Sequence, residues 1–229
     1  MLSIKDLKVS YGSQEVLKGL NLEFKPGEVH GILGMNGAGK STFFHTLYGT
    51  KGIDSGECHY NGDWVNYRDI GLLETRPYFY PYMKGKEYIQ LLTMHNPKFD
   101  IEGWNQLFEL PLNQLIDNYS TGMKKKVAFM GMLALDRPIL ILDEPFNGVD
   151  LESNEKIIQI LTHLKKQNKI ILLSSHIIQA LADVADKISY LKDGKIVQTY
   201  TQEDFGQLHQ LISEMVKLDV DEKIQHLLD

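Results

Sequence analysis

A glycine-rich segment at residues 34–42 limits the folds open to this chain more than any other stretch. It reads Gly-Met-Asn-Gly-Ala-Gly-Lys-Ser-Thr and fits the pattern G-x-x-x-x-G-K-[ST] in full. A strand-like run precedes it at residues 28–33, and a helix-like run follows from residue 41. Glycines let main-chain N–H groups approach one anion closely, and the helix adds its positive N-terminal end. This glycine-rich loop therefore predicts a phosphate-binding site.

Individual residues of the glycine-rich loop have separate expected roles. Lys40 is expected to reach the outer phosphates, and the hydroxyl of Ser41 is expected to ligate Mg²⁺. A chance glycine-rich turn is the alternative, but the flanking strand and helix are the context that supports a P-loop. The expected cofactors are ATP and Mg²⁺, and the remaining nucleotide contacts are assigned to Asn36, Gly37, Ala38, Gly39 and Thr42.

Two adjacent acids, Asp143 and Glu144, follow the unbroken apolar run at residues 139–142. Unpaired carboxylates at the tip of a buried strand are costly, and a cation removes that cost. We expect Asp143 to hold Mg²⁺ and Glu144 to act as general base toward the attacking water. The alternative is a strand end with ordinary solvated acids.

His176 follows a second buried run, residues 170–173, and therefore points to the same crevice. It could hydrogen-bond the γ-phosphate, whereas a lone histidine is more often structural. The other seven histidines have only that structural interpretation.

Strand-like and helix-like segments alternate along the chain, which predicts an α/β fold with a mainly parallel core. Residues 75–135 favour helices and predict an insert in that frame. Leu208, Leu211, Ile212 and Met215 give the tail a helical stripe. The expected strands are residues 2–9, 20–24, 28–33, 56–60, 69–73, 139–142, 169–174 and a hairpin of 187–191 with 196–200.

Composition and sequence pattern argue against several classes of protein. The 229 residues carry a net charge of −6, whereas a dedicated nucleic-acid binder usually has a basic surplus. Cys58 is the only cysteine, so an intrachain disulfide is excluded and a reducing cytosol is expected. The N-terminus lacks a signal-peptide pattern, and the apolar runs are shorter than the roughly 18 residues of a membrane helix.

In motif order, essentially the whole chain resembles the ATP-binding cassette of an ABC transporter. Residues 119–123, Tyr-Ser-Thr-Gly-Met, resemble the family's LSGGQ signature. The resemblance implies one domain over residues 1–229: a P-loop NTPase (RecA-like) core with an N-terminal antiparallel β-subdomain, residues 1–74 and 136–229, and the helical insert at 75–135.

The resemblance also implies site residues and partners. Ser120, a good helix N-cap, and Gly122 of the signature would close over the ATP of a second cassette, in a head-to-tail dimer of identical or different chains. His176 matches the switch histidine, Asp150 the acid of the loop between cassettes, and Tyr11 the aromatic that stacks on adenine. An integral membrane subunit would be the second partner, which places the chain peripherally on the cytoplasmic face of the membrane.

Two departures from the family pattern stand out. Thr121 and Met123 replace Gly and Gln of the signature, as in bacterial exporters of the drug and peptide-antibiotic type. The metal-sensing Gln after the strand near residue 73 is absent, and Glu74 or Thr75 takes its place. Together they favour an ATP-hydrolysing motor that exports drugs, lipids or amphipathic, antimicrobial peptides.

Two further segments carry open interpretations. The aromatic stretch 78–82 either anchors the coupling helix of the membrane subunit or packs the insert onto the sheet. Lys124, Lys125 and Lys126 are interpreted as a solvated helix face. As alternatives to a transporter motor we consider a soluble ABC ATPase acting on nucleic acid or ribosomes, which the acidic charge disfavours, and a P-loop kinase, which the Asp143–Glu144 pair disfavours.

Overall fold

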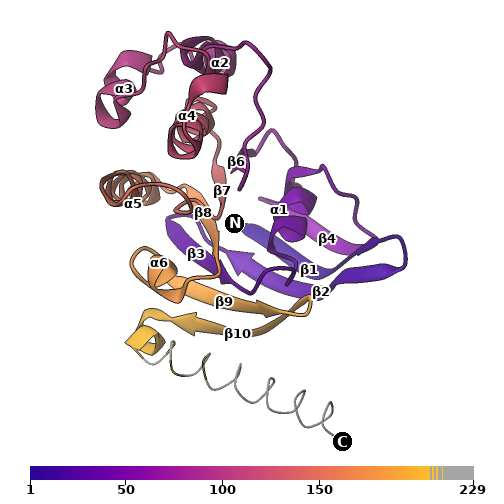
Figure 1. Cartoon of the computed structure of the whole chain (residues 1–229). Coiled ribbons are helices and arrows are strands. Elements are labelled where there is room, and N and C mark those ends of the chain that lie inside the picture. Colours follow the sequence, from indigo (N-terminus) through magenta and orange to yellow (C-terminus); the bar gives the residue numbers. More distant parts are fainter. Residues whose placement is uncertain (207, 209, 211–212, 214–229) are drawn as a thin grey trace, which may run out of the picture.

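The computed structural model of the chain describes residues 1–206, 208, 210 and 213. It holds two β-sheets, and Figure 1 shows helices on both sides of the larger one. The smaller sheet is antiparallel, with strand order β2-β1-β4-β5. Its strands are β1 (Leu2–Tyr11), β2 (Gln14–Phe24), β4 (Ser55–Tyr60) and β5 (Asp63–Trp64).

The larger sheet has the order β10-β9-β3-β8-β7-β6. Neighbouring strands run parallel from β9 to β6, and β10 alone is antiparallel, to β9. The strands are β3 (Glu28–Leu33), β6 (Ile70–Leu73), β7 (Ile139–Asp143), β8 (Ile170–Ser175), β9 (Lys187–Lys192) and β10 (Lys195–Thr201).

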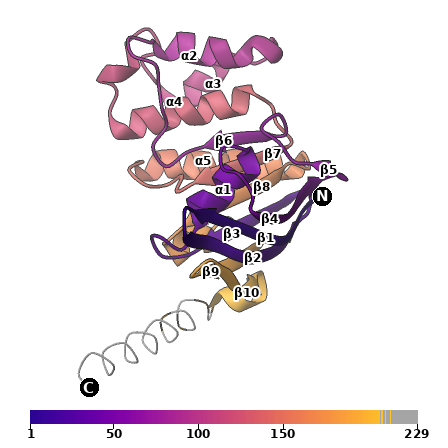
Figure 2. The same cartoon turned by 90° about the vertical axis from the view of Figure 1, so that its right-hand side faces the viewer.

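The helices form two groups. Helix α1 lies between the two sheets, while α2, α3 and α4 gather at one end of the molecule, beyond α5 (Figure 2). No helix in the described ranges has both the length and the apolarity needed to cross a membrane. The helices are α1 (Lys40–Tyr48), α2 (Gly85–Leu92), α3 (Ile101–Phe108), α4 (Thr121–Ala134), α5 (Leu151–Lys166) and α6 (Ile178–Ala182), with 3₁₀ turns η1 (Thr93–His95), η2 (Ile116–Asn118) and η3 (Gln202–Asp204).

The apolar runs of β7 and β8 are unbroken because both faces of the larger sheet are buried. Ile139 and Ile141 of β7 pack with Phe43 and Phe44 of α1 on the face toward the smaller sheet. Their neighbours on β7 and β8, such as Leu140, turn to the opposite face and pack with α4 and α5. Side chains alternate along a strand, so a strand between two cores needs apolar residues at every position.

The parallel arrangement places the functional segments together. The glycine-rich loop follows β3, Asp143 ends β7, and His176 follows β8. The register pairs Leu33 with Ser175 and Asp143 with Ser174. Parallel strands end at the same edge, so these segments meet at one crevice.

The α/β fold with a mainly parallel sheet and an N-terminal antiparallel sheet is confirmed. The strand expected at residues 20–24 is too short, because β2 already begins at Gln14. Register shifts in the β1–β2 pairing, and Gly19 at φ 85°, interrupt the alternation that marks a strand in sequence.

Smaller differences concern the helices. Helix α6 was not predicted, since five residues carry too little periodicity. In the tail, Leu208 is buried, whereas Leu211, Ile212 and Met215 lie outside the described residues. The insert boundaries at 75 and 135 stay a prediction.

Candidate functional site

The glycine-rich loop joins β3 to α1 and forms one wall of a pocket of about 770 Å³. Gly37 and Gly39 have φ values of 84° and 112°, a region that favours glycine. A Cβ on Gly39 would lie 2.8 Å from Leu17 Cδ2, and one on Gly34 would lie 2.6 Å from the Leu191 carbonyl oxygen. The loop can therefore keep this shape only with glycines at those positions.

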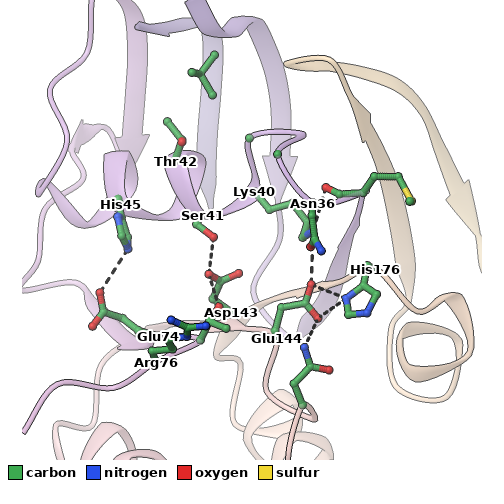
Figure 3. Close-up of a pocket in the computed structure, with 16 residues that line it drawn as sticks. Asn36, Lys40, Ser41, Thr42, His45, Glu74, Arg76, Asp143, Glu144 and His176 are labelled. Atoms are coloured by element: carbon green, nitrogen blue, oxygen red, sulfur yellow. Dashed lines mark hydrogen bonds and ion pairs between the residues drawn. The ribbon is translucent and has the colours of Figure 1, made fainter. Parts of the chain in front are cut away.

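Lys40 begins α1 and is buried in the pocket. Its Nζ donates to the carbonyl oxygen of Gly34 at 2.7 Å and lies 3.4 Å from Glu144 Oε1. Figure 3 shows Lys40 and His176 both pointing at the Glu144 carboxylate. The ammonium thus lies between the glycine-rich loop and the acid at the end of β7.

Asp143 accepts hydrogen bonds from three hydroxyls on three different segments. Ser41 Oγ donates to Oδ2 at 2.7 Å, Thr75 Oγ1 donates to Oδ2 at 2.8 Å, and Ser174 Oγ donates to Oδ1 at 2.5 Å. A carboxylate beside a hydroxyl is an oxygen donor set that suits Mg²⁺, which in nucleotide sites takes one or two protein ligands and completes its shell with phosphates and water. The described residues form no cluster of three or more His, Cys, Asp or Glu side chains that could hold a metal ion.

Glu144, the residue after Asp143, is buried and has a φ of 50°. His176 Nδ1 lies 3.0 Å from Oε1 and 3.1 Å from Oε2, and Asn147 Nδ2 donates to Oε2 at 3.3 Å. The main-chain N–H of Glu144 donates to Ser174 Oγ at 2.9 Å. A carboxylate that faces a phosphate-sized pocket among such partners can accept a proton from a water molecule.

The two candidates for the place of the missing Gln, Glu74 and Thr75, both line the pocket but differ in their contacts. Thr75 points to Asp143, whereas Glu74 turns away and lies 3.3 Å from His45 Nε2 of α1. Arg76 also lines the pocket. Sequence reasoning missed His45 and Arg76, because neither belongs to a recognisable motif.

The interpretation of Lys124–Lys126 as a solvated face is wrong for two of the three lysines. Lys125 is only 2% exposed, and the Lys126 side chain is only 15% exposed, with its Nζ 3.7 Å from Asp150 Oδ2. Burial lowers the pKa of Lys125, against the opposing pull of Glu144 and Asp143. The signal was present, because Phe129 lies four residues after Lys125, on the same buried helix face.

Several predicted site residues lie outside the pocket lining. Tyr11 is 51% exposed, with Lys51 Nζ 4.3 Å from its ring centroid. Ala38 is buried, and its carbonyl oxygen accepts from the N–H of Gly194 at 3.2 Å. Ser120 and Gly122, at the start of α4, also lie outside the lining; Ser120 Oγ accepts from the Met123 N–H at 3.2 Å and so caps the helix, as expected.

Asp150, the expected acid of the loop between cassettes, caps α5. It accepts from the N–H of Ser153 at 2.9 Å, and this hydrogen bond holds the pKa of Asp150 below its ordinary value. The remaining predicted residues do meet. The pocket lining brings together Asn36, Gly37, Gly39, Lys40, Ser41, Thr42, Asp143, Glu144 and His176.

A family model described as "ABC transporter" matches residues 17–147, more than half of the chain. The chain belongs to this family. As an ABC cassette it is a P-loop NTPase, and it binds and hydrolyses ATP as the motor subunit of a transporter. The arrangement of Lys40, Asp143 and Glu144 around one pocket provides the charged groups that this activity requires.

Curated relatives of known name span nearly the full length of the chain. Lantibiotic transport ATP-binding protein SrtF of Streptococcus pyogenes is 29% identical and covers 94% of this chain and 97% of its own. SkfA peptide export ATP-binding protein SkfE of Bacillus subtilis is 27% identical and covers 95% and 96%. Energy-coupling factor transporter ATP-binding protein EcfA of Methanocaldococcus jannaschii is 30% identical and covers 100% and 88%.

Among solved structures, an ATP-binding subunit of an ABC transporter superposes with a TM-score of 0.88 at 26% identity, covering 94% of this chain and 99% of the other.

A ribose import protein, RbsA of Bacillus licheniformis, is also among the sequence relatives, at 27% identity over 97% of this chain and 49% of its own. Exporters and importers alike therefore share this cassette.

Proposed function

We propose that this chain drives an exporter of drugs, lipids or amphipathic, antimicrobial peptides. The observation that carries the proposal is the near full-length similarity to SrtF and SkfE, whose names include lantibiotic transport and peptide export. The variant signature at residues 119–123 points the same way. On this proposal the chain works peripherally on the cytoplasmic face of the membrane, bound to a membrane-spanning subunit.

Three exposed tyrosines supply a surface for that subunit. Tyr78, Tyr80 and Tyr82 are 70%, 62% and 81% exposed, while Phe79, between the first two, and Met83, after the third, pack against the core. Packing onto the core thus applies to Phe79, and the exposed tyrosines are left free for the anchoring role that we propose. Exposed rings on a segment anchored by its neighbours suit the recognition of a short helix.

Roles in the ATP site follow from the geometry. Ser41 and Asp143 would hold Mg²⁺, which neutralises phosphate charge when bound. Lys40 would contact the outer phosphates, Glu144 would take the proton of the attacking water, and His176 would hold Glu144 and the γ-phosphate. Asn36, Gly37, Ala38, Gly39 and Thr42 would supply the rest of the phosphate cradle.

The start of α4 lies outside the pocket of its own chain, which suits an arrangement in which Ser120 and Gly122 would meet the nucleotide of a second cassette. We therefore propose a head-to-tail dimer, with Tyr11 beside the adenine. Light scattering of Glu144→Gln on a sizing column, with and without Mg-ATP, tests it. A shift from monomer to dimer on adding ATP supports a sandwich of two identical chains. A monomer that binds ATP contradicts self-association of the free chain, and the partner is then a different cassette or closure needs the membrane subunit.

Export itself is tested in the native host. Cells that produce Glu144→Gln instead of the wild-type chain should retain more of an amphipathic cationic peptide or a lipophilic dye, and the tagged chain should sediment with membranes. The triple change of Tyr78, Tyr80 and Tyr82 to Ala should release it from membranes while its ATPase activity in solution persists. A wild-type chain that stays in the soluble extract, fully active, would overturn the proposal.

A further inference from the structure

Lys125 brings a buried ammonium to the main chain of the catalytic acid. It lies in the second turn of α4, and its Nζ donates to the carbonyl oxygen of Glu144 at 2.6 Å and to that of Asn147 at 3.1 Å. The second carbonyl lies three residues after the first. One side chain therefore clamps both ends of the turn that follows β7.

That turn has an unfavourable backbone conformation. Glu144 has a φ of 50°, in the left-handed region that residues with a Cβ avoid. The Asn147 N–H donates to the Glu144 carbonyl oxygen at 3.3 Å, beyond the usual range for an N–H···O bond. Lys125 donates to that same oxygen at 2.6 Å, so its charge-assisted bond is the shorter of the two.

The direction of the Glu144 carboxylate depends on this backbone. The backbone dihedrals of Glu144 set how its Cα–Cβ bond is oriented relative to the rest of the molecule and which rotamers are allowed, so a relaxation of the turn would reorient the carboxylate relative to the pocket and to His176. Near the same place, α4 abuts the turn closely: a Cβ on Gly122 would lie 3.0 Å from the Gly148 carbonyl oxygen. Helix and turn thus form one packed unit.

We propose that Lys125 is a positioning residue for ATP hydrolysis, which holds the turn 144–147 in the conformation that aims the Glu144 carboxylate at the pocket. Lys125 does not line the pocket, so it acts through Glu144 and not on the nucleotide. It also ties the start of α4 to the turn, so a displacement of this helix would be transmitted to the catalytic acid.

The test is Lys125→Met, which keeps the aliphatic stem and removes the donors. Misplacing a catalytic group by about 1 Å can cost about 10²-fold in rate, so we expect kcat to fall roughly 10–100-fold. ATP affinity should stay within about twofold, because the glycine-rich loop and Lys40 are untouched. Lys166→Met, a change of an exposed lysine in the last turn of α5, is the matched control.

A double-mutant cycle with Glu144→Gln separates positioning from general damage. In single-turnover assays, Lys125→Met should slow the wild-type enzyme but not the Glu144→Gln enzyme, whose base is already absent. An equal loss in both backgrounds, an unchanged kcat, or a loss of ATP affinity that matches the loss of kcat would each overturn the proposal.

Lys125→Gln serves as the conservative variant. Its shorter amide can still donate to one carbonyl, so it should turn over faster than Lys125→Met and slower than wild type. Should Lys125→Met fail to fold, Lys125→Gln carries the test alone. A fall in kcat of at least about threefold with ATP affinity retained supports positioning, and wild-type kcat refutes it.

Discussion

Replacing Glu144 by Gln should separate ATP binding from ATP hydrolysis. The change keeps the shape of the side chain and removes the proton acceptor. A general base contributes roughly 10²–10⁴-fold to rate, which corresponds to about 2.7–5.5 kcal/mol of barrier. Within the described part of the chain, Glu144 is the carboxylate that pairs with His176, at 3.0 Å, so the substitution also leaves His176 without that partner. We therefore expect the full loss in kcat.

ATP affinity should change in the opposite direction. Glu144 Oε1 lies 3.4 Å from Lys40 Nζ, and both side chains are buried. At that separation the attraction is about 5 kcal/mol for an effective dielectric constant of ~20, an upper limit that desolvation reduces. Gln frees Lys40 for phosphate and removes one negative charge from the pocket. ATP affinity should be equal to that of wild type or higher, by at most about tenfold.

Phosphate release measures kcat, and calorimetric titration with Mg-ATP measures affinity. Glu152→Gln, an exposed acid on the first turn of α5, is the control and should match wild type in both. Turnover of Glu144→Gln within a few-fold of wild type would refute Glu144 as base. A large loss of ATP affinity would refute the competition between Glu144 and phosphate for Lys40.

Three further experiments, two substitutions and one chemical labelling, test other parts of the structure. Lys40→Ala should weaken ATP binding about 10–100-fold, the value of lost charge-assisted hydrogen bonds, and unchanged affinity in titration would contradict its phosphate role. Gly194→Ala should lower the urea midpoint of unfolding more than Gly12→Ala. Both glycines have positive φ, which costs any other residue about 1–2 kcal/mol, but of the two only Gly194 would bring a Cβ into collision with a carbonyl, that of Val16, which adds about 1–3 kcal/mol. Equal midpoints for the two variants would contradict this reasoning. Cys58 is buried, which raises its thiol pKa to about 12, so a disulfide reagent at pH 8 should label it only after unfolding in urea; rapid labelling of the native chain would refute its burial.

The nucleotide pocket was predictable from sequence because its parts are local. The glycine-rich loop encodes its own conformation in glycines, and the acids of β7 follow directly from a run that both cores require to be apolar. Parallel pairing then brings β3, β7 and β8 to one edge without further information. Short-range sequence patterns thus predict many of the residues that line the pocket. The rule that parallel strands end at the same edge of a sheet predicts that these residues lie close together.

Contacts made across long sequence separations were not predictable in the same way. Thr75 meets Asp143 across 68 residues, and Lys125 meets Glu144 across 19. A lysine triplet reads as a charged surface, and only the helical phase of Lys125 relative to Phe129 reveals that it is buried. The long β2 strand was hidden for a related reason, since bulges and a glycine break its period.

The end of β7 contacts both the nucleotide pocket and the helices that gather beyond α5. Hydroxyls from α1, from the segment after β6 and from β8 converge on Asp143, and the ammonium of α4 holds the next residue from the side of the helices. Of these segments, α4 belongs to the helices that gather beyond α5, so a displacement of α4 would change what the Glu144 main chain contacts, while β8 and α1 would stay with the sheets. If Lys125 positions Glu144 as we propose, the position of α4 and the chemistry at the nucleotide are coupled through one hydrogen bond to the residue after Asp143.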